Sequence, residues 1–241
     1  NDWLVFVKNL YHSIKCKSKL ILLLLNNMKN KIQSNYQSET AELLLKLKAI
    51  KLQPNNPFNW ASGWKSPIYC DNRIILSSIN YRNRIASLFS QLIKEKYKDV
   101  EVIAGVATGA IGIGILVAEK LKLPFIYVRP EAKKHGRKNQ IEGEVSEGQK
   151  IVVIEDLIST GRSSLNAVKA LRNSKLNVLG MVAIFTYEFK VAEMNFKKDS
   201  VILDTLSNYS ELLKKAVEIN YVSNQDLETL RKWNYSPENW G

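Results

Sequence analysis

Short, uninterrupted apolar runs constrain the fold of this chain more than any other feature of its sequence. Each is bounded by glycine, proline or charged residues, and they lie at residues 102–107, 125–128, 151–154 and 178–185. Runs of this length without polar alternation are typical of strands buried on both faces of a sheet. Helical spacing of apolar residues occupies the stretches 110–122 and 163–173 between them. Alternating strands and helices predict right-handed crossovers, and hence an α/β fold with a central, mainly parallel sheet flanked by helices.

Four further helices are predicted from apolar spacing, at residues 38–51, 78–97, 207–218 and 224–233. Ser38 is a suitable N-cap for the first of them. Ser223 and Asp226 have the spacing of a capping box at the start of the last. A loop is predicted between the first two helices, because that stretch contains three prolines and a glycine: Pro54, Pro57, Gly63 and Pro67.

Composition limits the class of protein. Of the 241 residues, 45% are hydrophobic, which is enough for the core of one or two domains. No apolar run reaches the roughly 18–20 residues that a membrane span requires. The cysteines are Cys16 and Cys70, with no C-x-x-C pair, which excludes a disulfide framework and a cysteine zinc site. This cysteine usage fits a reducing cytoplasm better than secretion.

The charge of the chain favours an anionic ligand. It carries 35 Lys and Arg against 23 Asp and Glu, a net charge of +12. Such a balance is typical of proteins that bind nucleic acid, a membrane surface or phosphorylated small molecules. The lysines are spread along the sequence without a long basic block, however, so an ordinary solvated surface explains the charge equally well.

Residues 1–27 differ from the rest of the chain. They contain four lysines and one aspartate, and six apolar residues at 20–25 are followed by two asparagines. The apolar run is shorter than the roughly 7–15 residues of a signal peptide, and no small-residue cleavage site follows it. Because Met28 opens a stretch that resembles a natural start, we expect 1–27 to be an extension outside the domain. The alternative is an amphipathic N-terminal helix.

The stretch IVVIEDLISTGRSS at residues 151–164 combines two features that point to chemistry. An apolar strand leads directly into Glu155 and Asp156, and adjacent carboxylates at a strand end need a partner such as a metal ion or a polyol. Small hydroxyl residues and Gly161 then open a helix, where backbone N–H groups and the helix dipole suit a phosphate monoester. Together these features predict a ribose-5-phosphate site at the carboxyl end of a parallel strand.

Each half of this motif also has a plainer interpretation. Acidic pairs at strand ends are often simply solvated, and Ser-Thr-Gly is common in turns. The two halves in register after a buried strand favour a functional site. The motif is not a Walker A loop, because no G-K-[ST] follows any glycine. A Rossmann fingerprint is excluded because Val117 stands where a third glycine would follow Gly112 and Gly114.

A basic segment follows the second apolar run. Glu131 is the single acidic residue within ten residues that include six basic ones: Arg129, Lys133, Lys134, His135, Arg137 and Lys138. With Gly136 for flexibility, such a loop can close over pyrophosphate, neutralise its charge and exclude water. A solvated loop or a nucleic-acid contact explains the composition equally well. The other histidine, His12, lies in the expected N-terminal extension.

Four segments resemble a known family. Residues 151–164 are similar to the phosphoribosyl-pyrophosphate (PRPP) signature of type I phosphoribosyltransferases. Three others narrow the resemblance to orotate phosphoribosyltransferase in its bacterial form. FNWASGWKSPIYCDNR at 58–73 resembles the N-terminal motif, VRPEAKKHGRKNQIEG at 128–143 the mobile catalytic loop, and DLETLRKWNYSPENW at 226–240 the C-terminal tail.

The resemblance implies a type I phosphoribosyltransferase fold for a single domain at residues 28–241. Its parts would be a small hood at about 28–75, a core at about 76–205 and C-terminal helices at about 206–241. The implied reaction transfers the 5-phosphoribosyl group from PRPP to orotate, giving orotidine 5′-monophosphate and pyrophosphate, with Mg²⁺ as cofactor. The family also implies a cytoplasmic enzyme of pyrimidine biosynthesis. It implies a homodimer in which each catalytic loop acts in the partner's site, with neither membrane nor nucleic acid expected as a partner.

Site residues follow from the same resemblance. Glu155 and Asp156 would hold the ribose hydroxyls, and residues 160–163 the 5′-phosphate. The full set implied to bind PRPP is Arg129, Lys133, His135, Glu155, Asp156, Leu157, Ile158, Ser159, Thr160, Gly161, Arg162 and Ser163. Those implied to be catalytic are Lys133, His135 and Asp156. Ser159 is implied to contact orotate. No residue is assigned as a direct metal ligand, because Mg²⁺ would be held mainly by PRPP or pyrophosphate.

The sequence departs from the family pattern at several positions. Residues 105–112 lack a lysine that many relatives carry after the first sheet strand, and Pro130 replaces a second basic residue. Arg162 stands where glycine is usual, so it either assists the 5′-phosphate or crowds a turn of positive φ. Ala61 stands where other branches place a lysine that contacts orotate. Lys65 and Arg73 are substitutes by charge alone.

Two other functions remain open at this stage. One is a phosphoribosyltransferase for a purine base or uracil, against which the K-x-H-G sequence of the basic loop argues. The other is a PRPP-binding regulator that binds nucleic acid through the same fold. The net charge favours it weakly, but no helix-turn-helix is evident and a regulator does not need the loop cations.

Overall fold

The computed structural model describes residues 36–60, 63, 65–131 and 140–240. The chain divides into two compact units, Asn1–Tyr36 and Gln37–Gly241, and every element below belongs to the second. The expected extension at 1–27 and the central part of the basic loop, residues 132–139, lie outside the described residues.

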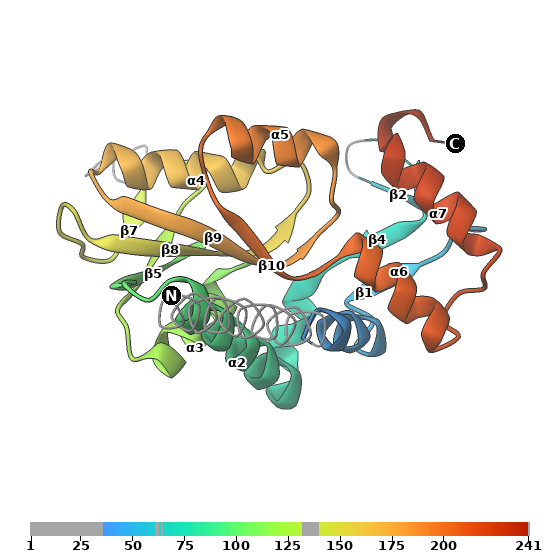
Figure 1. Cartoon of the computed structure of the whole chain (residues 1–241), viewed down its shortest axis with the longest axis horizontal. Helices are drawn as coiled ribbons and strands as arrows, with labels where there is room; N and C mark the ends of the chain where they lie inside the picture. The colour runs from blue at the N-terminus through green and yellow to red at the C-terminus, as the bar shows by residue number, and fades with distance from the viewer. Residues whose placement is uncertain (1–35, 61–62, 64, 132–139, 241) are drawn as a thin grey trace, which may run out of the picture. The chain divides into compact units, whose positions relative to one another are not determined.

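A six-stranded sheet forms the centre of this unit (Figure 1). Its strand order is β10-β9-β8-β5-β6-β7, and all neighbours are parallel except β6 and β7. The strands are β5 (Val102–Val106), β6 (Phe125–Val128), β7 (Ile141–Glu142), β8 (Lys150–Ile158), β9 (Asn177–Thr186) and β10 (Leu203–Asn208). The four apolar runs correspond to β5, β6, β8 and β9, which confirms the predicted mainly parallel sheet.

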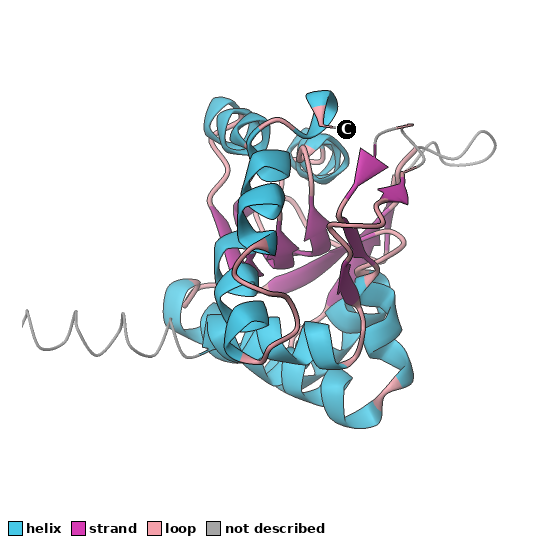
Figure 2. Cartoon of the chain, turned by 90° about the vertical axis from the view of Figure 1, so that its right-hand side faces the viewer, coloured by secondary structure: helices cyan, strands magenta, loops and turns pink. Residues whose placement is uncertain are grey.

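Helices cover both faces of the sheet (Figures 1 and 2). One face carries α2 (Ile79–Lys96) and α3 (Ile111–Leu121), and the other carries α4 (Arg162–Asn173) and α5 (Lys190–Lys198). Leu165, Val168 and Leu171 of α4 are buried in one cluster with Ile151 and Val153 of β8. The chain closes with α6 (Tyr209–Glu218), α7 (Asp226–Tyr235) and a short 3₁₀ turn, η2 (Pro237–Asn239).

One predicted helix is shorter than its apolar pattern indicated. Residues 37–46 are helical, but the helix does not continue to 51. Lys48 adopts a left-handed conformation with φ 57°, and its N–H bonds the carbonyl of Leu45, which ends the helix. Ile50–Leu52 then forms β1, antiparallel to β4 (Ile68–Cys70). The prediction of a helix over residues 38–51 is therefore wrong at its carboxyl end.

The segment between β1 and α2 forms small elements outside the main sheet. Within it, β2 (Phe58–Asn59) pairs antiparallel with β3 (Lys65–Ser66), and η1 (Asn72–Ser77) is a 3₁₀ helix. The resemblance implied a hood at about 28–75; from here on, the name hood refers to residues 50–77 of the structure. The Asp71 carboxylate caps η1 by accepting from the Arg73 backbone N–H at 3.2 Å.

An aromatic cluster joins the hood to the end of β9 and to α7. Trp233 of α7 is fully buried, and its ring lies 5.5–5.7 Å from four others: Trp60, Tyr187, Phe189 and Tyr209. At the start of the same helix, Ser223 Oγ donates to the Asp226 carboxylate at 2.8 Å and accepts from the Asp226 N–H at 3.3 Å. The Ser223 backbone N–H also donates to the Asp226 carboxylate at 2.9 Å, so the two residues make the reciprocal bonds of the predicted capping box, although α7 itself begins at Asp226 with Gln225 as its N-cap.

Truncating Trp233 tests whether α7 belongs to the folded core. Trp233→Ala should lower the free energy of unfolding by about 3–5 kcal/mol, because the surrounding rings lose their contacts. Trp233→Phe is the matched control, since it keeps an aromatic ring and removes an indole N–H that has no hydrogen-bond partner in the described structure. It should cost much less. Urea unfolding followed by circular dichroism measures both, and an alanine variant as stable as the wild type would contradict this packing.

Candidate active site

The carboxyl-terminal half of β8 carries the acidic pair and is paired on one side only. Pairing with β5 stops at Ile154, opposite Gly105, whereas pairing with β9 continues to Ile158, opposite Thr186. The predicted strand end at Ile154 is therefore wrong. Glu155 and Asp156 lie within the strand, because β9 continues to hold it beyond the last residue paired with β5.

Glu155 is held from within the protein. Its side chain is 5% exposed. One carboxylate oxygen accepts from Ser164 Oγ at 2.8 Å, and the other accepts from the Asp156 backbone N–H at 3.0 Å. Burial, and next the neighbouring charge of Asp156, raise the pKa of Glu155 well above its ordinary value. The two adjacent carboxyl groups thus have different environments.

Asp156 is partly exposed and packs against two other segments. Its carboxylate lies against Gly109 of the β5–α3 loop, where a Cβ would be 2.4 Å from Asp156 Oδ2. Only glycine leaves room there. The Asp156 carbonyl accepts from Asn72 Nδ2 at 2.6 Å, and Asn72, at the start of η1, is 3% exposed. The hood is therefore hydrogen-bonded to Asp156, and the β5–α3 loop packs against it.

The predicted phosphate loop leads into α4. Gly161 has φ 78° and ψ 0°, and its Cα packs against the Phe196 ring, which a Cβ would approach to 2.6 Å. The Thr160 carbonyl accepts from Asn195 Nδ2 at 2.9 Å, so α5 holds the loop from behind. No side chain caps the start of the 12-residue α4. Its first backbone N–H groups therefore form, with the helix dipole, a site for an anion.

Arg162 does not crowd this turn. The left-handed conformation belongs to Gly161, while Arg162 is the exposed first residue of α4. A side chain at that position is compatible with helical φ and ψ. Of the two alternatives for Arg162, the structure removes the strained one and leaves a cation beside the candidate phosphate site.

A cavity of about 360 Å³ opens between the hood and the end of β8; it is lined by Asn59, Trp60, Tyr69, Cys70, Leu157, Ser159 and Tyr187. We call it the base cavity. Burial raises the pKa of the Cys70 thiol and that of the Tyr187 hydroxyl well above their ordinary values, so both are neutral near pH 7. The cavity is flat-sided and aromatic, with amide and hydroxyl groups at its edge.

Sequence reasoning found only part of this cavity. Ser159 lines it, as the resemblance implied for a base contact. Lys65 and Arg73 do not line it, and Arg73 is paired with Asp71 at 2.7 Å. Trp60, Tyr69 and Cys70 lie within the quoted 58–73 motif, so the sequence could have indicated them. No sequence motif indicated Tyr187, which follows the end of β9.

The basic loop starts and ends on neighbouring strands. The Arg129 N–H donates to the Gln140 carbonyl at 2.8 Å, and Gln140 Nε2 donates to the Arg129 carbonyl at 2.8 Å. Arg129 Nη1 also lies 3.4 Å from the Glu142 carboxylate. Lys133 and His135 fall outside the described residues, so their positions stay predictions.

In the described part of the chain, no group of three or more His, Cys, Asp or Glu side chains is arranged to hold a metal ion. None of its helices is both long and apolar enough to cross a membrane.

The known proteins that this chain resembles are all phosphoribosyltransferases in the comparisons that follow. Residues 74–211 match the phosphoribosyl transferase domain model. The orotate phosphoribosyltransferase of Cytophaga hutchinsonii is 53% identical over 206 residues, covering 86% of this chain and 99% of that protein. That of Porphyromonas gingivalis is 55% identical over 201 residues, covering 83% and 96%. The crystal structure of the Aeropyrum pernix orotate phosphoribosyltransferase has a TM-score of 0.62 at 24% identity, covering 73% and 98%.

The pH dependence of stability tests the environment of Glu155. Because its pKa is raised on folding above the ordinary 4.5, the folded chain binds an extra proton in that window and loses stability as the pH rises through it. Glutamine keeps the shape and cannot ionise. Glu155→Gln should therefore gain stability relative to the wild type between about pH 5 and pH 8. Urea midpoints at both pH values measure this, and a constant difference would contradict it.

Proposed function

This chain belongs to the orotate phosphoribosyltransferase family, and we propose that the carboxyl edge of its sheet is where the 5-phosphoribosyl group passes from PRPP to orotate. The products are orotidine 5′-monophosphate and pyrophosphate. One observation carries this assignment: the acidic pair, the uncapped start of α4 and the base cavity meet around residues 155–161 of one strand and its loop. A ribose with a phosphate on one side and a base on the other requires this order of sites.

Ribose binding falls to Asp156, supported by Glu155. The Asp156 carboxylate is the more exposed of the pair and accepts hydrogen bonds from the ribose hydroxyls. Glu155 is already bonded to Ser164 and to the Asp156 N–H, so it fixes the backbone from which Asp156 projects. Backbone N–H groups at 160–163, with Leu157 to Ser159 leading into them, bind the 5′-phosphate. Arg162 adds a positive charge beside it.

Orotate fits the base cavity by shape. A planar pyrimidine ring can lie against the rings of Trp60, Tyr69 and Tyr187, while Asn59 and Ser159 offer hydrogen bonds at the edge. Leu157 closes the side toward β8. Because no cation lines this cavity among the described residues, recognition there relies on stacking and neutral hydrogen bonds.

Departure of pyrophosphate is the step that the protein's cations assist. As ribose takes on oxocarbenium character, negative charge collects on the leaving group. We propose that Arg129, at the root of the loop, binds this leaving group together with Lys133 and His135 of the loop itself. Mg²⁺, when bound with PRPP, neutralises part of this charge. The donor set fits it, since Mg²⁺ commonly uses one or two carboxylates plus substrate phosphates and Asp156 offers such a carboxylate.

We further propose a cytoplasmic homodimer in which each loop reaches the partner's site. Both ends of the loop are held where β6 pairs with β7, and the family resemblance assigns the residues between them to the partner's site. A loop of this kind excludes water when it closes.

An orotate assay tests the proposed reaction. Orotate should be consumed only with both PRPP and Mg²⁺, and uracil or adenine should not replace it. Asp156→Asn keeps the side-chain shape and removes the charge, so kcat/KM for PRPP should fall by roughly 10², a loss of about 3 kcal/mol at the transition state. Normal kinetics in that variant, or preference for another base, would overturn the assignment.

Subunit complementation tests the shared site. Lys133→Ala lacks a loop charge, Asp156→Asn lacks the ribose contact, and each homodimer should be nearly inactive. In a mixed dimer one site is intact and the other carries both changes. Mixing should therefore restore up to about a quarter of wild-type activity, because half the dimers are mixed and half their sites work. With subunit exchange verified by mass spectrometry, no recovery would mean that the loop acts within its own subunit.

A further inference from the structure

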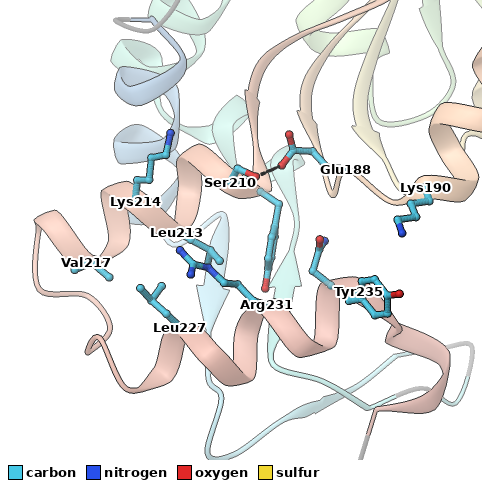
Figure 3. A pocket seen from close by; sticks show the side chains of 11 residues that line it. Glu188, Lys190, Ser210, Leu213, Lys214, Val217, Leu227, Arg231 and Tyr235 are labelled. Carbon is cyan, nitrogen blue, oxygen red and sulfur yellow. Dashed lines mark hydrogen bonds between the residues drawn. The ribbon is translucent and has the colours of Figure 1, made fainter.

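A second cavity lies at the same edge of the sheet, beyond β9 and β10 (Figure 3). Its volume of about 640 Å³ falls in the range of sites for small molecules. The residues that line it come from the segment after β9, from the start of α5, from α6 and from α7. In parallel α/β folds this edge is where ligands bind. None of the residues assigned to PRPP or orotate lines it, so the reaction leaves it unexplained.

The charges around this cavity do not balance. Lys190, Lys214 and Arg231 line it with a single carboxylate, that of Glu188. Glu188 is already engaged, because its Oε2 accepts from the Ser210 N–H at 2.8 Å and from Ser210 Oγ at 2.6 Å (Figure 3). Lys214 is paired with Glu211. In the described part of the chain, Lys190 and Arg231 have no carboxylate partner.

The walls offer an apolar surface and an aromatic ring. Leu213, Val217 and Leu227 form one side of the cavity. Tyr235 lies four residues after Arg231 on α7, so both project from one face of that helix. The Tyr235 ring is 77% exposed, and Lys190 Nζ lies 4.7 Å from its centre. Figure 3 shows Tyr235 at the Lys190 end of the cavity and the Arg231 side chain pointing toward Leu213 and Leu227. A ring at one end and a guanidinium without a carboxylate partner at the other are suited to a ligand that has both a flat ring and an anionic group.

We propose that this cavity binds a nucleoside monophosphate. The Arg231 fork meets the phosphate, for which its paired N–H groups have the right geometry. The base lies against the Tyr235 ring at the other end of the cavity, where Lys190 adds charge at the rim. The occupant is thus of the same chemical class as the product of the proposed reaction, at a site separate from the one that makes it.

Binding of a ligand in the second cavity should alter the base cavity. Asn234 lines the second cavity and donates Nδ2 to the Tyr187 carbonyl at 2.6 Å. Tyr187 lines the base cavity, and its ring packs 5.7 Å from that of Trp233 on the same helix as Arg231. A ligand that shifts α7 therefore shifts a wall of the base cavity. This coupling rests on the proposed function, whereas the binding itself does not.

Calorimetry with UMP and AMP tests the site. Each is titrated into the full chain with saturating PRPP and Mg²⁺ but no orotate, so that the catalytic 5′-phosphate site is occupied. One nucleotide should bind per chain, more tightly than uridine or inorganic phosphate alone. Arg231→Ala should weaken it by about ten- to a hundredfold, as expected for losing a charge-assisted hydrogen-bond pair. Lys232→Ala is the matched control, because it removes a neighbouring cation that is paired with Glu228 and lies outside the cavity. It should bind normally.

Three outcomes would overturn the proposal. Nucleotide binding abolished by PRPP would mean that only the catalytic site was occupied. Equal affinity in Arg231→Ala, or equal weakening in Lys232→Ala, would mean that no specific contact with Arg231 exists. As a second readout, nucleotide should change the orotate KM at saturating PRPP in the wild type and leave it unchanged in Arg231→Ala. If the chain turned over no orotate, the proposed function would fail while the titrations, repeated without PRPP, would still decide on this cavity.

Discussion

The one-sided pairing of β8 past Ile154 is the constraint on which the site depends. Beyond that residue β9 alone holds the strand, and four more residues extend past the end of β5 before the phosphate loop begins. The strand backbone thus supports the acidic pair. On the side that β5 no longer pairs, Gly109 packs against the Asp156 carboxylate and Asn72 donates a hydrogen bond to the Asp156 carbonyl. A site placed on a strand with one open edge combines precise positioning with access for a ligand.

The same geometry separates two adjacent carboxyl groups by environment. Glu155 points inward to Ser164, where burial raises its pKa, whereas Asp156 stays partly exposed beside the β5–α3 loop. Neighbouring groups with different environments can take different roles. In our account Glu155 positions the backbone and Asp156 meets the ribose. The residues that support each group come from three segments far apart in sequence.

The central strands and the motif of the candidate site could be predicted from the sequence, because each is recorded in a short stretch of residues. Buried parallel strands appear as continuous apolar runs, and the acidic pair with Gly161 marks both the proposed ribose site and the proposed phosphate site. By contrast, β10 has only two apolar residues, Leu203 and Leu206, without strict alternation, and α5 buries only Ala192 and Phe196, so neither has a strong pattern. The base cavity depends on Trp60 and Tyr187 meeting across the fold, which no local pattern records. Among the described residues no cation lines this cavity, which agrees with alanine at position 61 in the sequence.

The crystal structure of the chain with PRPP and Mg²⁺ tests the central claim most directly. It should place the 5′-phosphate within hydrogen-bond distance of the backbone N–H groups at 160–163. The ribose hydroxyls should lie on the Asp156 carboxylate, and C1 of the ribose should face the cavity lined by Tyr69 and Tyr187. PRPP bound with its 5′-phosphate away from the start of α4, or with its ribose out of reach of Asp156, would contradict the account.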